Sequence, residues 1–134
     1  MRPRIVLANG VFDIFHYGHL LHLEAAKAMG EILIVSITKD ESVNKGVGRP
    51  VFDVYQRQAI ISSLRCVDAT MIVSGSLQAL QEVLPDIFVK GSEYEGNINE
   101  ADQAFCDKNR IKILFTHEDT YSSTAILDNE SRCH

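Results

Sequence analysis

The chain has 134 residues, of which 46% are hydrophobic, and its formal net charge is −5 at pH 7. This length predicts one domain with a sizeable core, no apolar run is long enough to span a membrane, and the acidic balance argues against a nucleic-acid surface, which needs a basic face. Three cysteines without a C-x-x-C pair predict neither a disulfide framework nor a zinc knuckle, and with no signal peptide we expect a cytoplasmic protein.

Strand and helix patterns alternate along the whole chain. Short apolar runs predict strands at residues 5–7, 32–37, 69–73, 87–89 and 111–115. Helical spacing and capping residues predict helices at about 20–30, 53–63, 77–84, 99–108 and from about 122 onward. Such alternation with short links predicts a single α/β domain over residues 1–134. Its expected core is a five-stranded parallel doubly wound (Rossmann-like) sheet with helices on both faces.

The polar residues of interest fall in loops that follow predicted strands, at residues 8–19, 38–50, 90–96 and 116–124. The carboxyl ends of parallel strands meet at one edge of a sheet, and open α/β sheets bind ligands there. We therefore expect the chemistry to collect at this edge.

The first of these loops joins a strand to a helix and runs from Asn9 to His19. Free N–H groups at a helix start, together with two imidazoles, suit a multiply charged anion such as a triphosphate. Two alternatives stand beside this one. Gly10 could form an ordinary tight turn with capping or packed histidines, or His22 could extend His16 and His19 into a metal site. Steps of three residues rotate around a helix and no other ligand completes a tetrahedral set, so we expect no metal site and a solvated His22.

Gly10-Val-Phe-Asp13 and His16-Tyr-Gly-His19 together resemble the signature of the cytidylyltransferase-like nucleotidyltransferases. That resemblance implies transfer of NMP from a Mg²⁺-bound NTP to a phosphate, with release of pyrophosphate, in a single nucleotidyltransferase domain. It also implies that His16 and His19 hold the phosphates and stabilise the transition state, a reaction that needs positioning and charge rather than a covalent protein group. The expected nucleotide site includes Asn9, Gly10, Val11, Phe12, Asp13 and Gly18.

The second loop contains Lys45-Gly-Val-Gly-Arg-Pro50, and Arg57 follows on the next predicted helix. This segment resembles one in the adenylyltransferase half of ADP-heptose synthases. The resemblance implies a lid in which Lys45 acts as a catalytic cation on the triphosphate, and it makes Arg57 a substrate contact. The alternatives are a solvated flexible loop and an Arg57 that forms a structural ion pair.

The loop after the fourth strand, Val89-Lys-Gly-Ser-Glu-Tyr94, is similar to the V-K-G-G-D-Y segment of the same enzymes. The similarity implies that Lys90, Gly91 and Glu93 lie beside the nucleotide. Glu93 replaces Asp and keeps the charge, but moves it by a methylene. Without the resemblance, Gly91 would be a simple turn glycine.

The last loop ends in Tyr121, Ser122, Ser123 and Thr124, at the start of a predicted helix. Either serine could simply cap that helix. The family carries a similar S-S-T or S-T-T run, and the resemblance implies that these hydroxyls and the helix N–H groups bind the β- and γ-phosphates.

The resemblance as a whole favours an enzyme that moves AMP onto a heptose 1-phosphate. The partners are then an NTP and a phosphorylated small molecule, the cofactor is Mg²⁺ carried with the NTP, and we expect a homodimer. One alternative is a CTP-dependent enzyme that makes CDP-glycerol or a related CDP-alcohol. Another is a nucleotide-binding sensor without turnover, against which the intact His16 and His19 argue.

Overall fold

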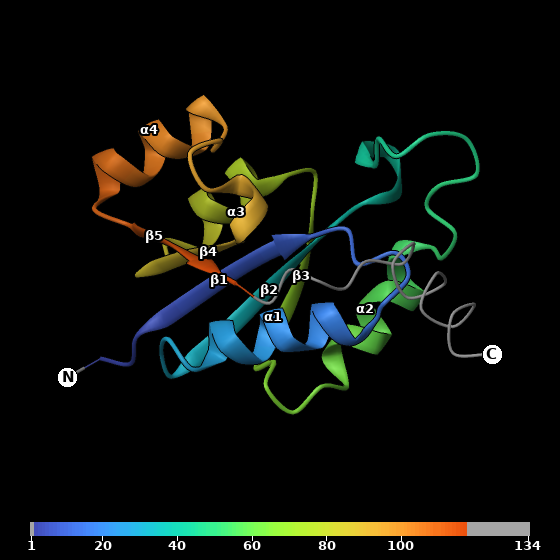
Figure 1. Ribbon diagram of the computed structural model, residues 1–134, viewed down its shortest axis with the longest axis horizontal. Coiled ribbons are helices and arrows are strands. Elements are labelled where there is room, and N and C mark those ends of the chain that lie inside the picture. Colours follow the sequence, from blue (N-terminus) through green and yellow to red (C-terminus); the bar gives the residue numbers. More distant parts are fainter. Residues whose placement is uncertain (1, 118–134) are drawn as a thin grey trace.

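The computed structural model describes residues 2–117 and contains one five-stranded parallel sheet in the order β3-β2-β1-β4-β5 (Figure 1). The predicted fold class is therefore confirmed. In chain order the elements are β1 Ile5–Gly10, α1 Tyr17–Lys27, β2 Ile32–Thr38, the 3₁₀ turn η1 Asp40–Ser42, α2 Val54–Ser62, β3 Ala69–Val73, α3 Ser76–Val83, β4 Ile87–Gly91, the 3₁₀ turn η2 Ser92–Tyr94, α4 Glu100–Asn109 and β5 Lys112–Thr116.

Helices cover both faces of the sheet, α1 and α2 on one and α3 and α4 on the other (Figure 1). Side chains of a strand point alternately to the two faces. In β1, Val6 and Ala8 accordingly join the core under α1 and α2, while Leu7 joins the core under α3 and α4. All three are fully buried, which explains why β1 is a continuous apolar run rather than an alternating one.

Local signals set the helix boundaries. Asp53 accepts a hydrogen bond from the N–H of Gln56, whose side chain in turn accepts from the N–H of Asp53, so the predicted capping box opens α2. Leu84, the last residue of the predicted helix, lies just outside α3: it caps the helix end in a left-handed conformation and is 56% exposed. The last predicted helix lies outside the described residues. Within them, no helix is long and apolar enough to cross a bilayer.

The strand order places a switch point between β1 and β4. The chain moves outward from β1 through β2 to β3, then returns to the other side of β1 and continues through β4 to β5. Connections leave the two neighbouring strands in opposite directions, so a crevice opens beyond their carboxyl ends. Gly10, at the end of β1, and Gly91, at the end of β4, border this crevice.

Candidate functional site

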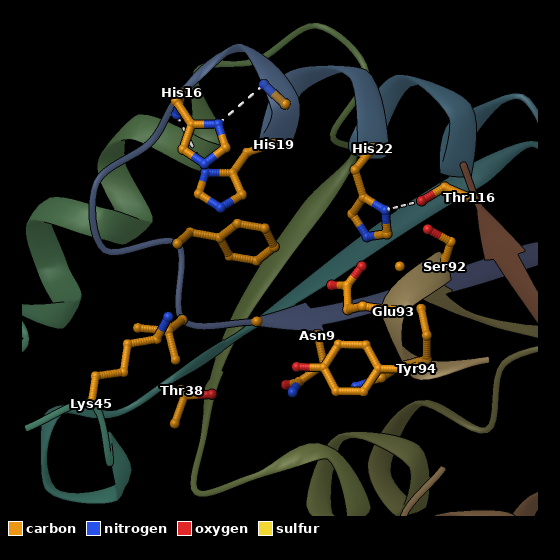
Figure 2. Close-up of a pocket in the computed structure, with 16 residues that line it drawn as sticks. Asn9, His16, His19, His22, Thr38, Lys45, Ser92, Glu93, Tyr94 and Thr116 are labelled. Carbon is orange, nitrogen blue, oxygen red and sulfur yellow. Dashed lines mark hydrogen bonds between the residues drawn. The ribbon is translucent and has the colours of Figure 1, made fainter. Parts of the chain in front are cut away.

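A cavity of about 550 Å³ occupies the crevice (Figure 2). Its wall is built from the ends of four strands, the first turns of α1, the turn η2 and the loop after η1. The lining residues are Asn9, Gly10, Val11, Phe12, His16, Gly18, His19, His22, Thr38, Lys45, Lys90, Gly91, Ser92, Glu93, Tyr94 and Thr116. The structure thus brings together residues from all four of the predicted loops, the last of them represented by Thr116.

The two motif histidines form the start of α1. Nδ1 of His16 accepts a hydrogen bond from the N–H of Gly18 at 3.1 Å, and Nδ1 of His19 accepts from the N–H of His16 at 3.3 Å. The rings are stacked, with centroids 3.8 Å apart and 25° between their planes. This reciprocal cap satisfies two N–H groups that a helix start would otherwise leave unpaired. The capping role and a ligand-binding role are therefore compatible.

Burial keeps both rings neutral, and the cap decides which nitrogen of each ring carries the proton. Burial lowers the pKa of His16, and it lowers that of His19 to about 4, helped by the nearby charges of His16, His22 and Lys45. Both imidazoles are therefore neutral at pH 7. Since each Nδ1 is an acceptor, the proton lies on Nε2, and within residues 2–117 neither Nε2 has a hydrogen-bond partner. The pair offers two N–H donors to a ligand in the cavity.

Phe12 supports this pair from below. Its ring meets the His19 ring edge-on, with centroids 5.4 Å apart, and its backbone has the unusual φ of 52°. A Cβ on Gly10 would come within 2.8 Å of the Phe12 ring, so this position needs glycine for close approach. Gly10 is the last residue of β1 and does not have a positive φ, so the tight-turn alternative is wrong.

Lys45 is the basic residue that the predicted lid contributes to the cavity wall. It is exposed, and it precedes two glycines whose φ values of 102° and 80° are those that side-chain-bearing residues rarely adopt. The far end of the loop is anchored, because Nε of Arg49 donates to Asp13 at 2.5 Å. This end of the loop is thus fixed next to the turn after β1.

Asp13 does not line the cavity, contrary to the expectation. It is 3% exposed, and its carboxylate accepts hydrogen bonds from Arg49 and from the backbone N–H groups of Val51 and Phe52. Burial raises the pKa of Asp13, but these hydrogen bonds lower it more, so the net pKa lies below the usual value. Asp13 holds the end of the loop that contains Lys45 against the turn after β1.

Arg57 is also placed behind the cavity, not in it. It is fully buried, and its guanidinium donates to the carbonyls of Phe52, Val11 and Thr38 and to the carboxylate of Asp40 at 2.6 Å. The structural ion-pair alternative therefore describes its position. Through Val11 and Thr38, which do line the cavity, Arg57 supports the wall from the protein interior.

The end of β4 supplies a cation and a carboxylate. Nζ of Lys90 lies 4.2 Å from the ring centroid of Tyr94 and 5.5 Å from that of Phe88. Burial lowers the pKa of Lys90, while Asp102 and Glu93 oppose that shift. A Cβ on Gly91 would come within 2.6 Å of both Glu93 oxygens, so the glycine lets this carboxylate fold back over the strand end.

Five of the lining residues were not assigned to the site from the sequence. One of them is His22, and the other four lie at or next to strand ends. They are Thr38, Ser92, Tyr94 and Thr116. The expectation that His22 is solvated is wrong, because its Nδ1 lies 2.6 Å from Oγ1 of Thr116 across the cavity wall (Figure 2). The available signal was helical spacing. His22 lies one helical turn beyond His19. Both side chains can therefore line a cavity that runs along the helix, even though they cannot all point at a single metal ion together with His16.

Two further predictions concern the phosphate tail and the metal. Tyr121, Ser122, Ser123 and Thr124 lie outside the described residues. Among residues 2–117, no group of three or more His, Cys, Asp or Glu side chains could hold a metal ion. Magnesium commonly uses substrate phosphates, waters and only one or two carboxylates, and Glu93 is the carboxylate of the described cavity wall. A single carboxylate, that of Glu93, is compatible with a Mg²⁺ that would be held mainly by phosphate oxygens.

Comparison with known proteins agrees with this arrangement. A family model described as cytidylyltransferase-like matches residues 7–129. The bifunctional protein HldE of Shewanella amazonensis is 39% identical over an alignment of 131 positions, which covers 94% of this chain and 27% of that protein. HldE of Helicobacter pylori strain P12 is 36% identical over an alignment of 137 positions, which covers 99% of this chain and 29% of that protein. The chain thus spans less than a third of the length of these relatives.

Solved structures show the same fold. A lipopolysaccharide core biosynthesis protein from Thermoplasma volcanium is 33% identical with a TM-score of 0.73, over 87% of this chain and 98% of that one. Pantoate-β-alanine ligase from Francisella tularensis has a TM-score of 0.61 over 96% of this chain and 69% of its own. At 16% identity, the second similarity concerns the fold alone.

Proposed function

The chain belongs to the cytidylyltransferase-like family of nucleotidyltransferases, and we propose that it transfers AMP from ATP to a heptose 1-phosphate with release of pyrophosphate. The observation that carries the proposal is the stacked pair of neutral histidines in the wall of the 550 Å³ cavity, with both Nε2–H donors unused by the described residues. Fixed donors of this kind stabilise charge that develops in a transition state without any reorganisation.

The positions of the other groups support the same reaction. Lys45 lies on one wall of the cavity and Lys90 on another, so a triphosphate between them would meet a cation on either side. Gly18, in the first turn of α1, lets phosphates approach the helix start closely. A Mg²⁺ carried with the nucleotide would neutralise part of its charge, and Glu93 is the residue expected to lie near it.

The choice of ATP and a heptose acceptor rests on similarity. The HldE relatives are ADP-heptose synthases, and Lys45-Gly-Val-Gly-Arg-Pro50 resembles a segment of their adenylyltransferase half. A structural neighbour bears the name of a lipopolysaccharide core biosynthesis protein. Because a site that pairs with one base leaves buried groups unpaired with another, we expect a strong preference for one nucleotide.

The test is pyrophosphate release from ATP or CTP in the presence of heptose 1-phosphate or glycerol 3-phosphate. We expect turnover with ATP and heptose 1-phosphate and little with the other three combinations. Turnover of CTP with ATP inert would support the CDP-alcohol alternative and overturn adenylyl transfer. Nucleotide binding without pyrophosphate release for any pair would support a sensor and overturn the enzyme proposal.

A further inference from the structure

A second cavity, of about 380 Å³, adjoins the first beyond the end of β4. It opens between the first turns of α3 and α4, and the two cavities share Lys90 and Tyr94. Its volume falls within the roughly 300–1,000 Å³ of small-molecule sites. The residues that line it are Ser76, Lys90, Tyr94, Asn97, Ile98, Asn99, Glu100 and Asp102.

Asp102 gives this cavity a built polar wall. The residue is only 3% exposed, and its Oδ2 accepts a hydrogen bond from Oγ of Ser76 at 2.5 Å. Within the described part of the chain, Oδ1 of Asp102 accepts no hydrogen bond. Every fully buried side-chain nitrogen or oxygen there has a hydrogen-bond partner, so Oδ1 is not fully buried. Oδ1 is therefore accessible from the cavity, where it can accept a hydrogen bond from a ligand.

The composition of the wall selects among ligand classes. A carboxylate, a hydroxyl and the amides of Asn97 and Asn99 offer closely spaced donors and acceptors, as a compound with several hydroxyl groups requires. A nucleobase would need apolar faces, but Tyr94, the one aromatic residue among the described residues of the wall, already has the Lys90 ammonium over its ring at 4.2 Å. The wall therefore fits a polyol better than a base.

Charge sets the direction in which such a ligand would lie. Glu100 and Asp102 are acidic and belong to α4, whereas the cation Lys90 stands at the junction with the first cavity. A phosphate would be repelled by the two carboxylates and attracted to the ammonium. A phosphorylated polyol is thus oriented with its hydroxyls on α4 and its phosphate toward the first cavity.

We propose that the second cavity is the acceptor subsite, which binds the ring of a sugar 1-phosphate through Asp102, Ser76 and Asn97 and directs its phosphate past Lys90. This inference rests on the proposed nucleotidyl transfer and assigns it a second binding site. Lys90 lies between two anions that must meet, and it lowers their mutual repulsion.

The transfer balances without a protein nucleophile. An oxygen of the acceptor's phosphate forms a bond to the α-phosphorus of ATP in the first cavity. The bond from that phosphorus to the oxygen bridging to the β-phosphorus breaks, and pyrophosphate leaves with the electron pair. The sugar nucleotide and pyrophosphate account for every atom and charge of the substrates, so no proton has to move.

The test compares Asp102→Asn and Asn97→Ala with Asp107→Asn, a matched control because Asp107 is an exposed carboxylate on the same helix outside both cavities. Pyrophosphate release is measured while ATP and heptose 1-phosphate are varied separately. Loss of a charged hydrogen-bond acceptor should raise the KM for heptose 1-phosphate about tenfold in Asp102→Asn, with the KM for ATP changed by less than about twofold. Asp107→Asn should match the wild type.

Asn97 is exposed and its side chain makes no hydrogen bond within residues 2–117, so Asn97→Ala keeps the test decisive if Asp102→Asn fails to fold. An unchanged KM for heptose 1-phosphate in both variants, with normal wild-type turnover, overturns the acceptor subsite alone. A wild-type protein that turns over no sugar 1-phosphate overturns the subsite together with the proposed function.

Discussion

Two polar clusters lie next to the turn after β1, and they differ in where their hydrogen bonds go. Asp13 and Arg57 are buried, and both side chains form their hydrogen bonds with backbone and side-chain groups of the protein. His16 and His19 use only Nδ1 within the described residues, and their Nε2–H groups have no partner there. A polar group whose capacity is used inside the protein fixes a loop, whereas one with capacity left over at a cavity is available to a ligand.

The largest expected effect breaks the first cluster. Arg57→Met leaves three carbonyls without the buried guanidinium that donates to them, whereas water can solvate the Asp40 carboxylate, whose side chain is 37% exposed. The free energy of unfolding should fall by about 3 kcal/mol or more, because each buried acceptor left without a hydrogen bond costs about 1–3 kcal/mol. Urea denaturation measures it. Arg65 is an exposed arginine, and Arg65→Met should stay within about 0.5 kcal/mol of the wild type. Equal stability of the two variants would refute a supporting role for Arg57.

For the second cluster we expect a large loss of turnover and only a small loss of stability. His16→Ala or His19→Ala removes a preorganised donor, so turnover should fall by about a hundredfold or more. The lost helix cap should cost about 0.5–2 kcal/mol, and the fold should persist. Pyrophosphate release and denaturation measured on the same samples separate the two effects. A variant that unfolds much more easily yet keeps its rate would show that the histidines are structural.

A smaller effect is expected at the lid loop. Lys45 lines the cavity and Lys39 does not, so Lys45→Ala should raise the KM for ATP about tenfold while Lys39→Ala changes it little. Hydrogen exchange of the loop amides should slow when ATP is added. Identical exchange with and without ATP would count against a lid.

The smallest effect concerns pH. The pKa of His19 is about 4 in the folded protein against an ordinary 6.5. Below pH 6.5 the unfolded chain therefore binds a proton that the folded one rejects, and stability falls as the pH is lowered from about 6.5 to about 4. Above that window the contribution of His19 is constant. Urea denaturation at about pH 7 and about pH 5 should show a smaller fall for His19→Ala than for the wild type. An equal fall in stability for the two proteins would show that His19 keeps its ordinary pKa in the folded state.

The sequence predicts the sheet well because its signals are local. Apolar runs identify every strand of the sheet, although β1 continues to Gly10 and β4 to Gly91, three and two residues beyond the predicted ends. The capping box that begins at Asp53 was likewise readable from residues three apart. The cavity also lies at the edge where the parallel strands end, which is where the sequence predicts the site.

The sequence predicts less well which polar residues face the cavity. Asp13 binds backbone groups 38 and 39 residues away, and Arg57 binds a carbonyl 46 residues away. No spacing in the sequence reveals that those partners are in reach. His22 was misplaced for a related reason, because its partner Thr116 is 94 residues distant and only the fold brings β5 beside α1.

The central claim is that the cavity transfers the nucleotidyl group rather than a terminal phosphate. The direct measurement is the fate of label from ATP carrying ³²P in the α- or the γ-position, incubated with heptose 1-phosphate. We predict that α-label appears in the sugar nucleotide and γ-label in pyrophosphate, and that both products are nearly lost in His16→Ala and His19→Ala. Label from the γ-position on the sugar, or transfer that persists in both histidine variants, would contradict the account.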